Sequence, residues 1–196
     1  GYRWLASLFK EALAEDIEIA AQTQAGADRF ISVGANPQHT HVVGSIKFDL
    51  EVSPETREQG QVLRASMFVD REVWVAGSTH ALEEDAVLRA HAQLRATHPR
   101  ASLVLVPRHP NRFDEVRASL DAKKISYVTR SSRAMPTQQT EVVLVDTLGE
   151  LLLFYATADI AFVGGSLVPI GGHNLLEPAA LGLPVITGPN NFNAPD

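Results

Sequence analysis

The chain has 196 residues, enough for one well-packed domain and part of another, and 45% of them are hydrophobic, as is usual for a folded protein. Its net charge of -6 counts against a nucleic-acid-binding domain, which normally has a basic surface. The absence of cysteine excludes disulfides, thiolate chemistry and cysteine-bound zinc, and no apolar run approaches the roughly 18 residues that cross a bilayer.

The first 44 residues predict part of a β-α-β arrangement. Apolar residues at helical spacing predict a helix over 2–14. Short apolar runs predict strands over 17–21 and 41–44, with a helix over 24–33 between them. We expect residues 1–44 to be the last portion of one domain.

A linker and a connecting helix are expected over residues 45–70, because Pro54 and mixed charge follow the second strand. A second domain is expected over 71–196. The chain starts within a predicted helix without an initiator Met, and it stops directly after a buried strand. We therefore expect a piece of a longer protein, truncated within its second domain.

From residue 71 onward, apolar strands alternate with helices. Strands are predicted over 73–76, 102–106, 127–129, 141–145, 160–163 and 185–187. Helices are predicted over 82–97, 112–123, 148–156 and 175–181. This alternation predicts an α/β fold with a parallel sheet and helices on both of its faces. Ligands of such sheets bind beyond the carboxyl ends of the strands, so the loops there are the candidate site.

Residues 164–188 are the most informative of these segments, because two glycine pairs separate a buried strand from a short helix. Glycines let a backbone come close to a ligand, and a helix start offers free N–H groups and the positive end of its dipole to an anion. We expect a phosphorylated ligand here. The candidate residues are Gly164, Gly165, Ser166, Gly171, Gly172 and His173.

Two turns combine a capping pattern with a second interpretation. Thr147 and Glu150, and likewise Asn174 and Glu177, have the three-residue spacing of a helix capping box. The carboxylate of Glu177 can also accept the hydroxyl groups of a ribose, because a carboxylate has about four acceptor sites. We expect caps at both turns, and a role in ligand binding stays open beside them.

Two further loops remain ambiguous. Arg108 follows a predicted strand, where its guanidinium can pair with a phosphate or simply face solvent. A tight loop is expected at 77–79, where Ser78 and Thr79 either cap the next helix or hold a phosphate. Neither G-x-G-x-x-G nor a P-loop occurs, so NAD and ATP sites are poorly supported. The seven histidines are scattered, and no metal-binding spacing or catalytic triad is found.

Taken together, four segments resemble the bacterial 3-deoxy-D-manno-octulosonic acid (Kdo) transferases over essentially the whole chain. These segments read VVGSIKFD, VWVAGSTHALEEDAVLRAH, LVLVPRHPNRF and VVLVDTLGELLLFYATADIAFVGGSLVPIGGHNLLEPAALGLPVITGP. The wider GT-B group of glycosyltransferases, which have two Rossmann-like domains, shares only the looser GG…E…G-x-P-V pattern. The resemblance is therefore to the transferases of Kdo in particular.

The resemblance implies inverting transfer of Kdo from CMP-Kdo to a lipid A precursor (lipid IVA) in lipopolysaccharide synthesis, without a cofactor or a metal. It implies a Rossmann-like C-terminal domain that binds the donor, preceded by the tail of a second such domain. The positions that match the family's CMP contacts are Pro107, Arg108, Leu148, Gly149, Glu150, Asn174, Leu175, Leu176 and Glu177. The family usually has Pro and Met where this chain has Leu175 and Leu148, a mild change at positions that act through their backbone.

The same resemblance implies a catalytic glutamate, most of the acceptor surface and a membrane anchor in an N-terminal part that is not among these residues. We thus expect no catalytic residue in this chain, which by itself would be soluble and inactive, whereas the whole protein would lie at the cytoplasmic face of the bacterial inner membrane. Two alternatives stay open: another GT-B enzyme, such as a UDP-sugar transferase or epimerase, and a nucleotide-sugar-binding module without catalysis.

Overall fold

The computed structural model describes residues 12–13, 17–45 and 50–193. Most of the helix expected over 2–14 therefore lies outside the described residues. The chain divides into two compact units, residues 1–49 and 50–196.

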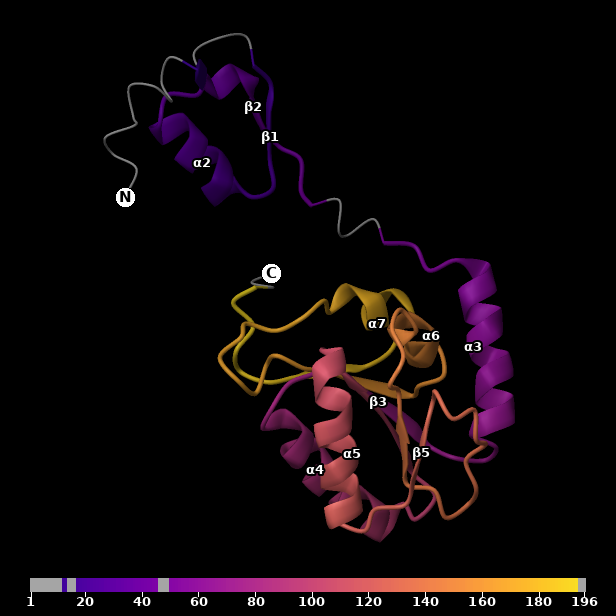
Figure 1. Ribbon diagram of the computed structural model, residues 1–196. Helices are drawn as coiled ribbons and strands as arrows, with labels where there is room; N and C mark the ends of the chain where they lie inside the picture. The colour runs from indigo at the N-terminus through magenta and orange to yellow at the C-terminus, as the bar shows by residue number, and fades with distance from the viewer. Residues whose placement is uncertain (1–11, 14–16, 46–49, 194–196) are drawn as a thin grey trace. The chain divides into compact units, whose positions relative to one another are not determined.

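In its described residues, the first unit contains a small parallel sheet whose two strands are connected through helical segments (Figure 1). Its elements are β1 (Ile19–Ala21), α2 (Gln24–Ser32), the 3-10 helix η2 (Pro37–His39) and β2 (Thr40–Val42). The helix begins where the hydroxyl of Thr23 accepts a hydrogen bond from the backbone N–H of Gly26, at 3.1 Å. Strand, helix and parallel strand follow one another, as the sequence pattern predicts.

The second unit is built on a six-stranded sheet in which every neighbouring pair is parallel. Its strands are β3 (Val73–Thr79), β4 (Ser102–Pro107), β5 (Tyr127–Thr129), β6 (Val142–Leu144), β7 (Ile160–Val163) and β8 (Val185–Thr187). Their spatial order is β5-β6-β4-β3-β7-β8. The chain therefore builds one half of the sheet from β3 outward and then returns to the other side of β3 for the last two strands.

Helices cover both faces of this sheet (Figure 1). They are α3 (Pro54–Met67), α4 (Glu83–Thr97), the 3-10 helix η4 (Pro110–Arg112), α5 (Phe113–Ala122), α6 (Leu151–Tyr155) and α7 (Leu176–Ala180). Alternate residues of each strand enter two separate cores: Val75 packs with α3 and α6, whereas Ala76 packs with α4 and α5. The predicted parallel α/β sheet with helices on both faces is confirmed.

The prediction of a tight loop at 77–79 is wrong, because these residues continue β3. Gly77 lies opposite Val106 of β4, and its carbonyl accepts a hydrogen bond from the N–H of Gly164 at 2.8 Å. A side chain at position 77 would collide with the phenol of Tyr155. This glycine is therefore required by the close packing of a buried aromatic ring and not by a turn.

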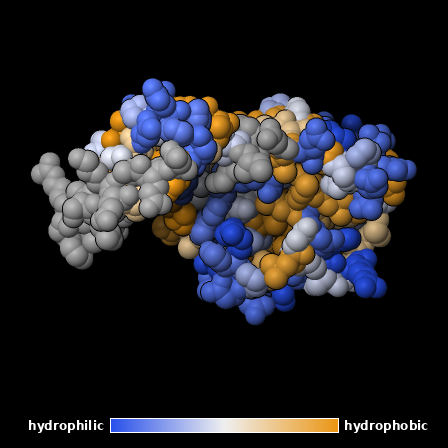
Figure 2. Space-filling model, turned by 90° about the horizontal axis from the view of Figure 1, so that it is seen from above, coloured by the Kyte–Doolittle hydropathy of each residue, from blue (hydrophilic) through white to orange (hydrophobic). Residues whose placement is uncertain are grey.

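Apolar residues also reach the surface. Leu82 is 78% exposed and Leu148 is 72% exposed. Figure 2 shows hydrophobic residues interleaved with hydrophilic ones on the face seen from above. Scattered apolar residues are normal on a folded surface, so they do not by themselves mark a site.

Candidate functional site

The carboxyl ends of β4, β3 and β7 meet at one edge of the sheet, because these three strands are adjacent and parallel. The chain leaves β3 toward β4 on one side and later returns to β7 on the other. Loops that leave neighbouring strands in opposite directions open a crevice, and such switch points are where open α/β sheets bind their ligands.

A cavity of about 360 Å³ lies where these loops converge. Its lining residues are Ser78, Arg108, Gly149, Leu151, Leu152, His173, Asn174 and Glu177. All of them except the two leucines of α6 are among the residues that we predicted for the site. The leucines were assigned only to a helix, because nothing in the local pattern shows which apolar side chains of α6 face a ligand rather than the core.

The remaining predicted residues lie outside this lining. They are Thr79, Pro107, Leu148, Glu150, Gly164, Gly165, Ser166, Gly171, Gly172, Leu175 and Leu176. Several of them are buried behind the cavity, among them Pro107 at the end of β4 and Ser166 in the loop after β7. Leu148 is exposed, and Glu150 faces a neighbouring cavity.

Arg108 is the cation of this site. Its backbone N–H donates to the carbonyl of Thr79 at 2.9 Å, which joins the ends of β4 and β3. Its side chain is exposed, and no described residue forms an ion pair or a hydrogen bond with its guanidinium. A guanidinium with free donors at a strand end is suited to bind a phosphate or carboxylate oxygen pair.

Glu177 is the carboxylate of the site. The side-chain amide of Asn174 donates to its Oε1 at 3.1 Å, while Oδ1 of Asn174 accepts from the N–H of Leu176 at 3.0 Å. The expected cap is therefore formed in part: Asn174 caps the first N–H of α7, but Glu177 bonds to the side chain of Asn174 and not to its backbone N–H, so the full capping box is absent. Among the described residues, no cation pairs with Glu177. Its second oxygen is therefore available to ligand hydroxyl groups.

The turn before α6 has a different arrangement. Arg130 donates from Nη2 to Oε1 of Glu150 at 2.7 Å, and from Nε to both carboxylate oxygens. Thr147 donates to Oε2 of the same carboxylate. The capping box expected at this turn is also absent, because Glu150 itself is the residue before the helix and its side chain is bonded to Arg130. The hydrogen bond from Arg130, followed by the bond from Thr147, lowers the pKa of Glu150.

Backbone N–H groups of this turn remain free. The N–H groups of Leu148, Gly149 and Glu150 donate to no acceptor within the described chain. Gly149 has a φ of +80°, which glycine adopts easily, and a Cβ atom at this position would meet no atom within 4 Å. The turn therefore presents unpaired donors beside an open space at the edge of the cavity.

Three histidines meet beside Arg108, although the sequence shows them as scattered. Nε2 of His80 lies 2.6 Å from Nε2 of His173, and the ring of His109 contacts His80 edge-on with 5.3 Å between centroids. Burial is the main cause that lowers the pKa of both His80 and His173, and the positive neighbour Arg108 lowers both further. Among the residues that line the cavity, Arg108 is the permanently charged cation. Within the described ranges, no three His, Asp or Glu side chains are grouped to hold a metal ion.

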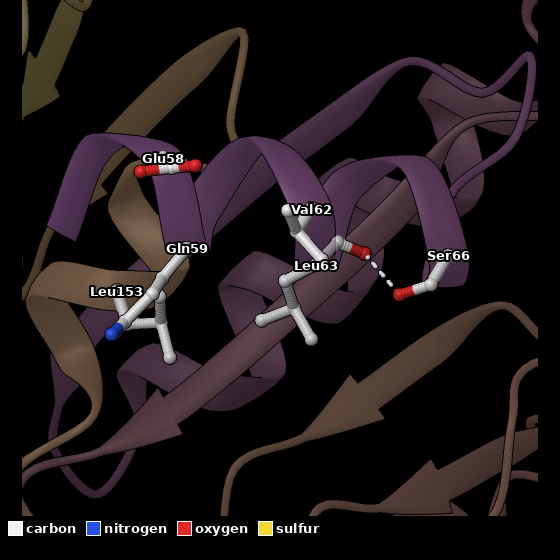
Figure 3. A pocket seen from close by; sticks show the side chains of 6 residues that line it. All are labelled: Glu58, Gln59, Val62, Leu63, Ser66 and Leu153. Carbon is white, nitrogen blue, oxygen red and sulfur yellow. Dashed lines mark hydrogen bonds between the residues drawn. The ribbon is translucent and has the colours of Figure 1, made fainter. Parts of the chain in front are cut away.

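A second hollow is lined by residues of α3 and by Leu153 of α6. Figure 3 shows its lining, in which Val62, Leu63 and Leu153 supply apolar surface and Ser66 donates to the carbonyl of Leu63 at 3.0 Å. Its charged residue is Glu58, so it repels rather than attracts an anion. The cavity at the strand ends is therefore the better candidate.

Comparison with known proteins identifies the family. The model of the family described as 3-deoxy-D-manno-octulosonic-acid transferase (kdotransferase) matches residues 1–50. The chain is 43% identical over 178 residues to the 3-deoxy-D-manno-octulosonic acid transferase of Haemophilus influenzae, and 40% identical over 197 residues to that of Bordetella pertussis. These alignments cover 91% and 98% of this chain, and 42% and 45% of the two relatives.

One solved structure is similar in both sequence and fold. It is the crystal structure of the C-terminal CMP-Kdo binding domain of WaaA from Acinetobacter baumannii, with a TM-score of 0.67 and 38% identity. The match covers 72% of this chain and 74% of that domain. The chain spans less than half the length of the two curated relatives, but it covers most of the solved domain. The resemblance expected from the motifs is confirmed, and the chain belongs to the 3-deoxy-D-manno-octulosonic acid (Kdo) transferase family.

Proposed function

We propose that this chain supplies the donor-binding part of an inverting glycosyltransferase that transfers Kdo from CMP-Kdo to a lipid A precursor during lipopolysaccharide synthesis. The similar domain from Acinetobacter baumannii is described as binding CMP-Kdo. The cavity at the strand ends has the chemistry that such a donor needs: a free cation for its phosphate, a carboxylate for its ribose, and free backbone donors beside them.

The roles follow from the contacts. Arg108 would pair with the phosphate of CMP and stabilise the negative charge that grows on CMP as it leaves, a contact worth about 1.5–3 kcal/mol. Glu177 would accept the ribose hydroxyls, oriented by its bond to Asn174. The free N–H groups of 148–150 would contact the nucleotide. None of these residues is assigned as the base that deprotonates the acceptor.

The observation that carries the proposal is the presence of one unpaired guanidinium and one carboxylate without a cation in the same cavity. Two opposite charges that lie in one pocket but do not pair with each other match a ligand that needs both. A purely structural role would favour pairing, as seen for Glu150 and Arg130.

The acceptor and the cellular site are part of the proposal. The two curated relatives carry the name 3-deoxy-D-manno-octulosonic acid transferase. We infer that the whole protein acts on a lipid A precursor at the cytoplasmic face of the bacterial inner membrane. Among the described helices, none has the length and hydropathy needed to span a bilayer.

Calorimetric titration with CMP tests the donor assignment. We expect CMP to bind more tightly than AMP, UMP or UDP, and Arg108→Ala to weaken CMP binding about tenfold to a hundredfold, as the loss of a charge-assisted contact requires. Arg100→Ala is the matched control, because Arg100 is an exposed arginine just before β4, at the opposite end of that strand. Equal affinity for CMP and AMP would contradict the proposal, and preference for UDP would favour a UDP-sugar enzyme.

A further inference from the structure

The carboxylate of Glu83 lies at the beginning of α4 and is completely buried. Its Oε2 accepts hydrogen bonds from the backbone N–H groups of His80 at 2.9 Å and Gly165 at 2.7 Å. Its Oε1 accepts from the N–H groups of Ser166 at 3.0 Å and Leu167 at 2.9 Å. One side chain thus receives four backbone donors from two loops that are more than 80 residues apart in the sequence.

No described cation pairs with Glu83, so these four N–H groups are what stabilises its buried charge. Three of the donors belong to the consecutive residues 165–167, an arrangement that forms a concave site for an anion. In many α/β proteins such a site holds the phosphate of a ligand. Here the protein fills it with a carboxylate of its own.

The residues held by Glu83 connect directly to the cavity. The N–H groups of Gly171 and Gly172 both donate to the carbonyl of Gly165, at 3.1 and 2.8 Å, and the N–H of His173 donates to the carbonyl of Gly164 at 3.2 Å. These bonds close the loop between β7 and α7 on itself. His173, whose ring lines the cavity, is therefore fixed by the same segment that encloses the carboxylate.

The end of β3 and the loop that follows it are held from the other side. Ser78, which also lines the cavity, has a φ of +54°, and Leu82 has a φ of +75°. Both are left-handed conformations that cost a residue with a side chain free energy and persist only where surrounding contacts impose them. The bond from the N–H of His80 to Glu83 lies between these two strained positions.

We propose that Glu83 is a positioning residue of the donor site: its carboxylate acts as a built-in anion that locks the loop of residues 164–173 against the loop after β3, so that Ser78 and His173 are in place before the donor binds. This role rests on the proposed donor-binding function. It also implies that the donor phosphate is bound by Arg108 and not by the N–H groups of residues 165–167.

The test compares Glu83→Gln with Glu84→Gln in the full chain. Glu84 is the neighbouring buried carboxylate of α4, but its partner is the guanidinium of Arg112. Glutamine at position 83 keeps the size of the side chain but turns one acceptor into an N–H donor that faces other donors. Amide hydrogen exchange of residues 165–167, thermal unfolding and CMP titration are measured for both variants.

We expect Glu83→Gln to speed exchange at residues 165–167 by about a hundredfold and to weaken CMP binding about tenfold. For Glu84→Gln we expect a lower melting temperature with CMP affinity within about twofold of the unaltered chain. If Glu83→Gln does not fold, Glu83→Asp supplies the same comparison, because it keeps the charge and withdraws the carboxylate by one methylene.

Unchanged exchange at residues 165–167 in a folded Glu83→Gln chain would overturn the proposal. Unchanged CMP affinity in a variant with faster exchange would overturn it as well, since the loop would then be ordered without consequence for the donor. Failure of the unaltered chain to bind CMP would reject the donor assignment instead, and the exchange data would still decide whether Glu83 holds the loop.

Discussion

The turn at residues 147–150 and the turn at 174–177 show the same local pattern, with a small polar residue three positions before a glutamate. Their carboxylates differ in the structure. Glu150 is bound by Arg130 and Thr147, whereas Glu177 faces the cavity and, among the described residues, is bound only by Asn174. The comparison shows that a sequence pattern can place a carboxylate at a turn without deciding whether that carboxylate is free to bind a ligand.

The difference arises from what lies beside each turn. Arg130 directly follows the edge strand β5, and its N–H donates to the carbonyl of Leu144 in β6 at 2.8 Å, which fixes the arginine next to the turn before α6. Its guanidinium also lies over the ring of Phe154, with 5.7 Å to the centroid. The described residues around the other turn include no equivalent cation paired with Glu177.

The largest expected effect is a loss of stability in acid that comes from His91. It limits the pH range in which variants of the two carboxylates can be compared. Burial is the main cause that lowers the pKa of His91 from 6.5 to about 4. The unfolded chain binds a proton on this ring below about pH 6.5, but the folded chain does so only near pH 4. Stability therefore falls as the pH drops from 6.5 to 4, by about 3 kcal/mol in total for this group. Urea unfolding at a series of pH values measures this loss.

His91→Gln should remove most of that pH dependence, at the cost of the hydrogen bond that Trp74 donates to Nδ1 of His91 at 3.0 Å. His98→Gln is the control, because His98 has an exposed side chain, and we expect the acid-induced loss to persist in it. If the loss persisted equally in His91→Gln, another group would be responsible.

The next largest effect should follow from Glu177→Gln. The change exchanges one acceptor oxygen for an amide and leaves a ribose hydroxyl poorly matched, which costs about 1–3 kcal/mol, or about fivefold to 150-fold in CMP affinity. The free energy of unfolding should change little, because no described cation pairs with this carboxylate. In the whole enzyme, raised CMP-Kdo should recover much of the rate.

Loss of turnover at saturating donor with intact CMP binding would instead make Glu177 a catalytic residue. Glu150 and Glu177 would then differ as a structural and a catalytic carboxylate, and not as a structural and a ligand-binding one.

Glu150→Gln should have the opposite signature, with a smaller magnitude. Removing the charge that bonds to Arg130 should lower the free energy of unfolding by about 1 kcal/mol, since both side chains are partly exposed. Because the pKa of Glu150 is lowered in the fold, its contribution is present at neutral pH and is lost as the pH falls below 4.5. Denaturant unfolding at pH 7 and pH 3.5 checks this, and CMP affinity should stay within about threefold.

The smallest expected effect is that of alanine at two glycines with a left-handed backbone. It distinguishes the cost of backbone strain from the loss of a contact with the ligand. Gly149 and Gly182 have φ values of +80° and +81°, and a Cβ atom at either position meets nothing within 4 Å. Alanine at either position should thus destabilise the fold by about 1 kcal/mol through the left-handed backbone alone. Gly149 lines the cavity and Gly182 does not, so only Gly149→Ala should also weaken CMP binding. Equal CMP affinity in both variants would place the turn of Gly149 outside the binding site.

The sequence predicts the central strands β4 and β6 well because each is an apolar run buried on both faces, a pattern that depends little on its neighbours. Helix starts are less well predicted: α6 begins at Leu151 instead of 148, and α7 at Leu176 instead of 175. Before α6, Thr147 bonds to the side chain of Glu150 and does not cap the helix, whereas Asn174 caps the first N–H of α7 and also bonds to the side chain of Glu177. Competition between a local cap and a partner from elsewhere in the fold cannot be read from local spacing.

The candidate site also contains residues that the sequence indicated and contacts that it did not. Arg108 and Glu177 were candidates from the sequence, because polar residues that directly follow buried strands or begin short helices are recognisable as such; both line the cavity, and their role in binding stays a prediction. The contacts of Glu83 were not predicted from the sequence. Its partners at 165–167 are more than 80 residues away and are backbone N–H groups, which carry no signal in the sequence.

The sequence by itself therefore determined the parallel α/β sheet and the family, because periodic burial and motif order are properties of the chain. The tertiary structure alone decided which charged side chains near the carboxyl ends of the strands already have partners within the chain. Glu83 and Glu150 are occupied by donors from distant segments, whereas Arg108 and Glu177 are left without ionic partners among the described residues. Whether a charge is free depends on the three-dimensional proximity of its partners, and the fold sets that proximity independently of their separation along the chain.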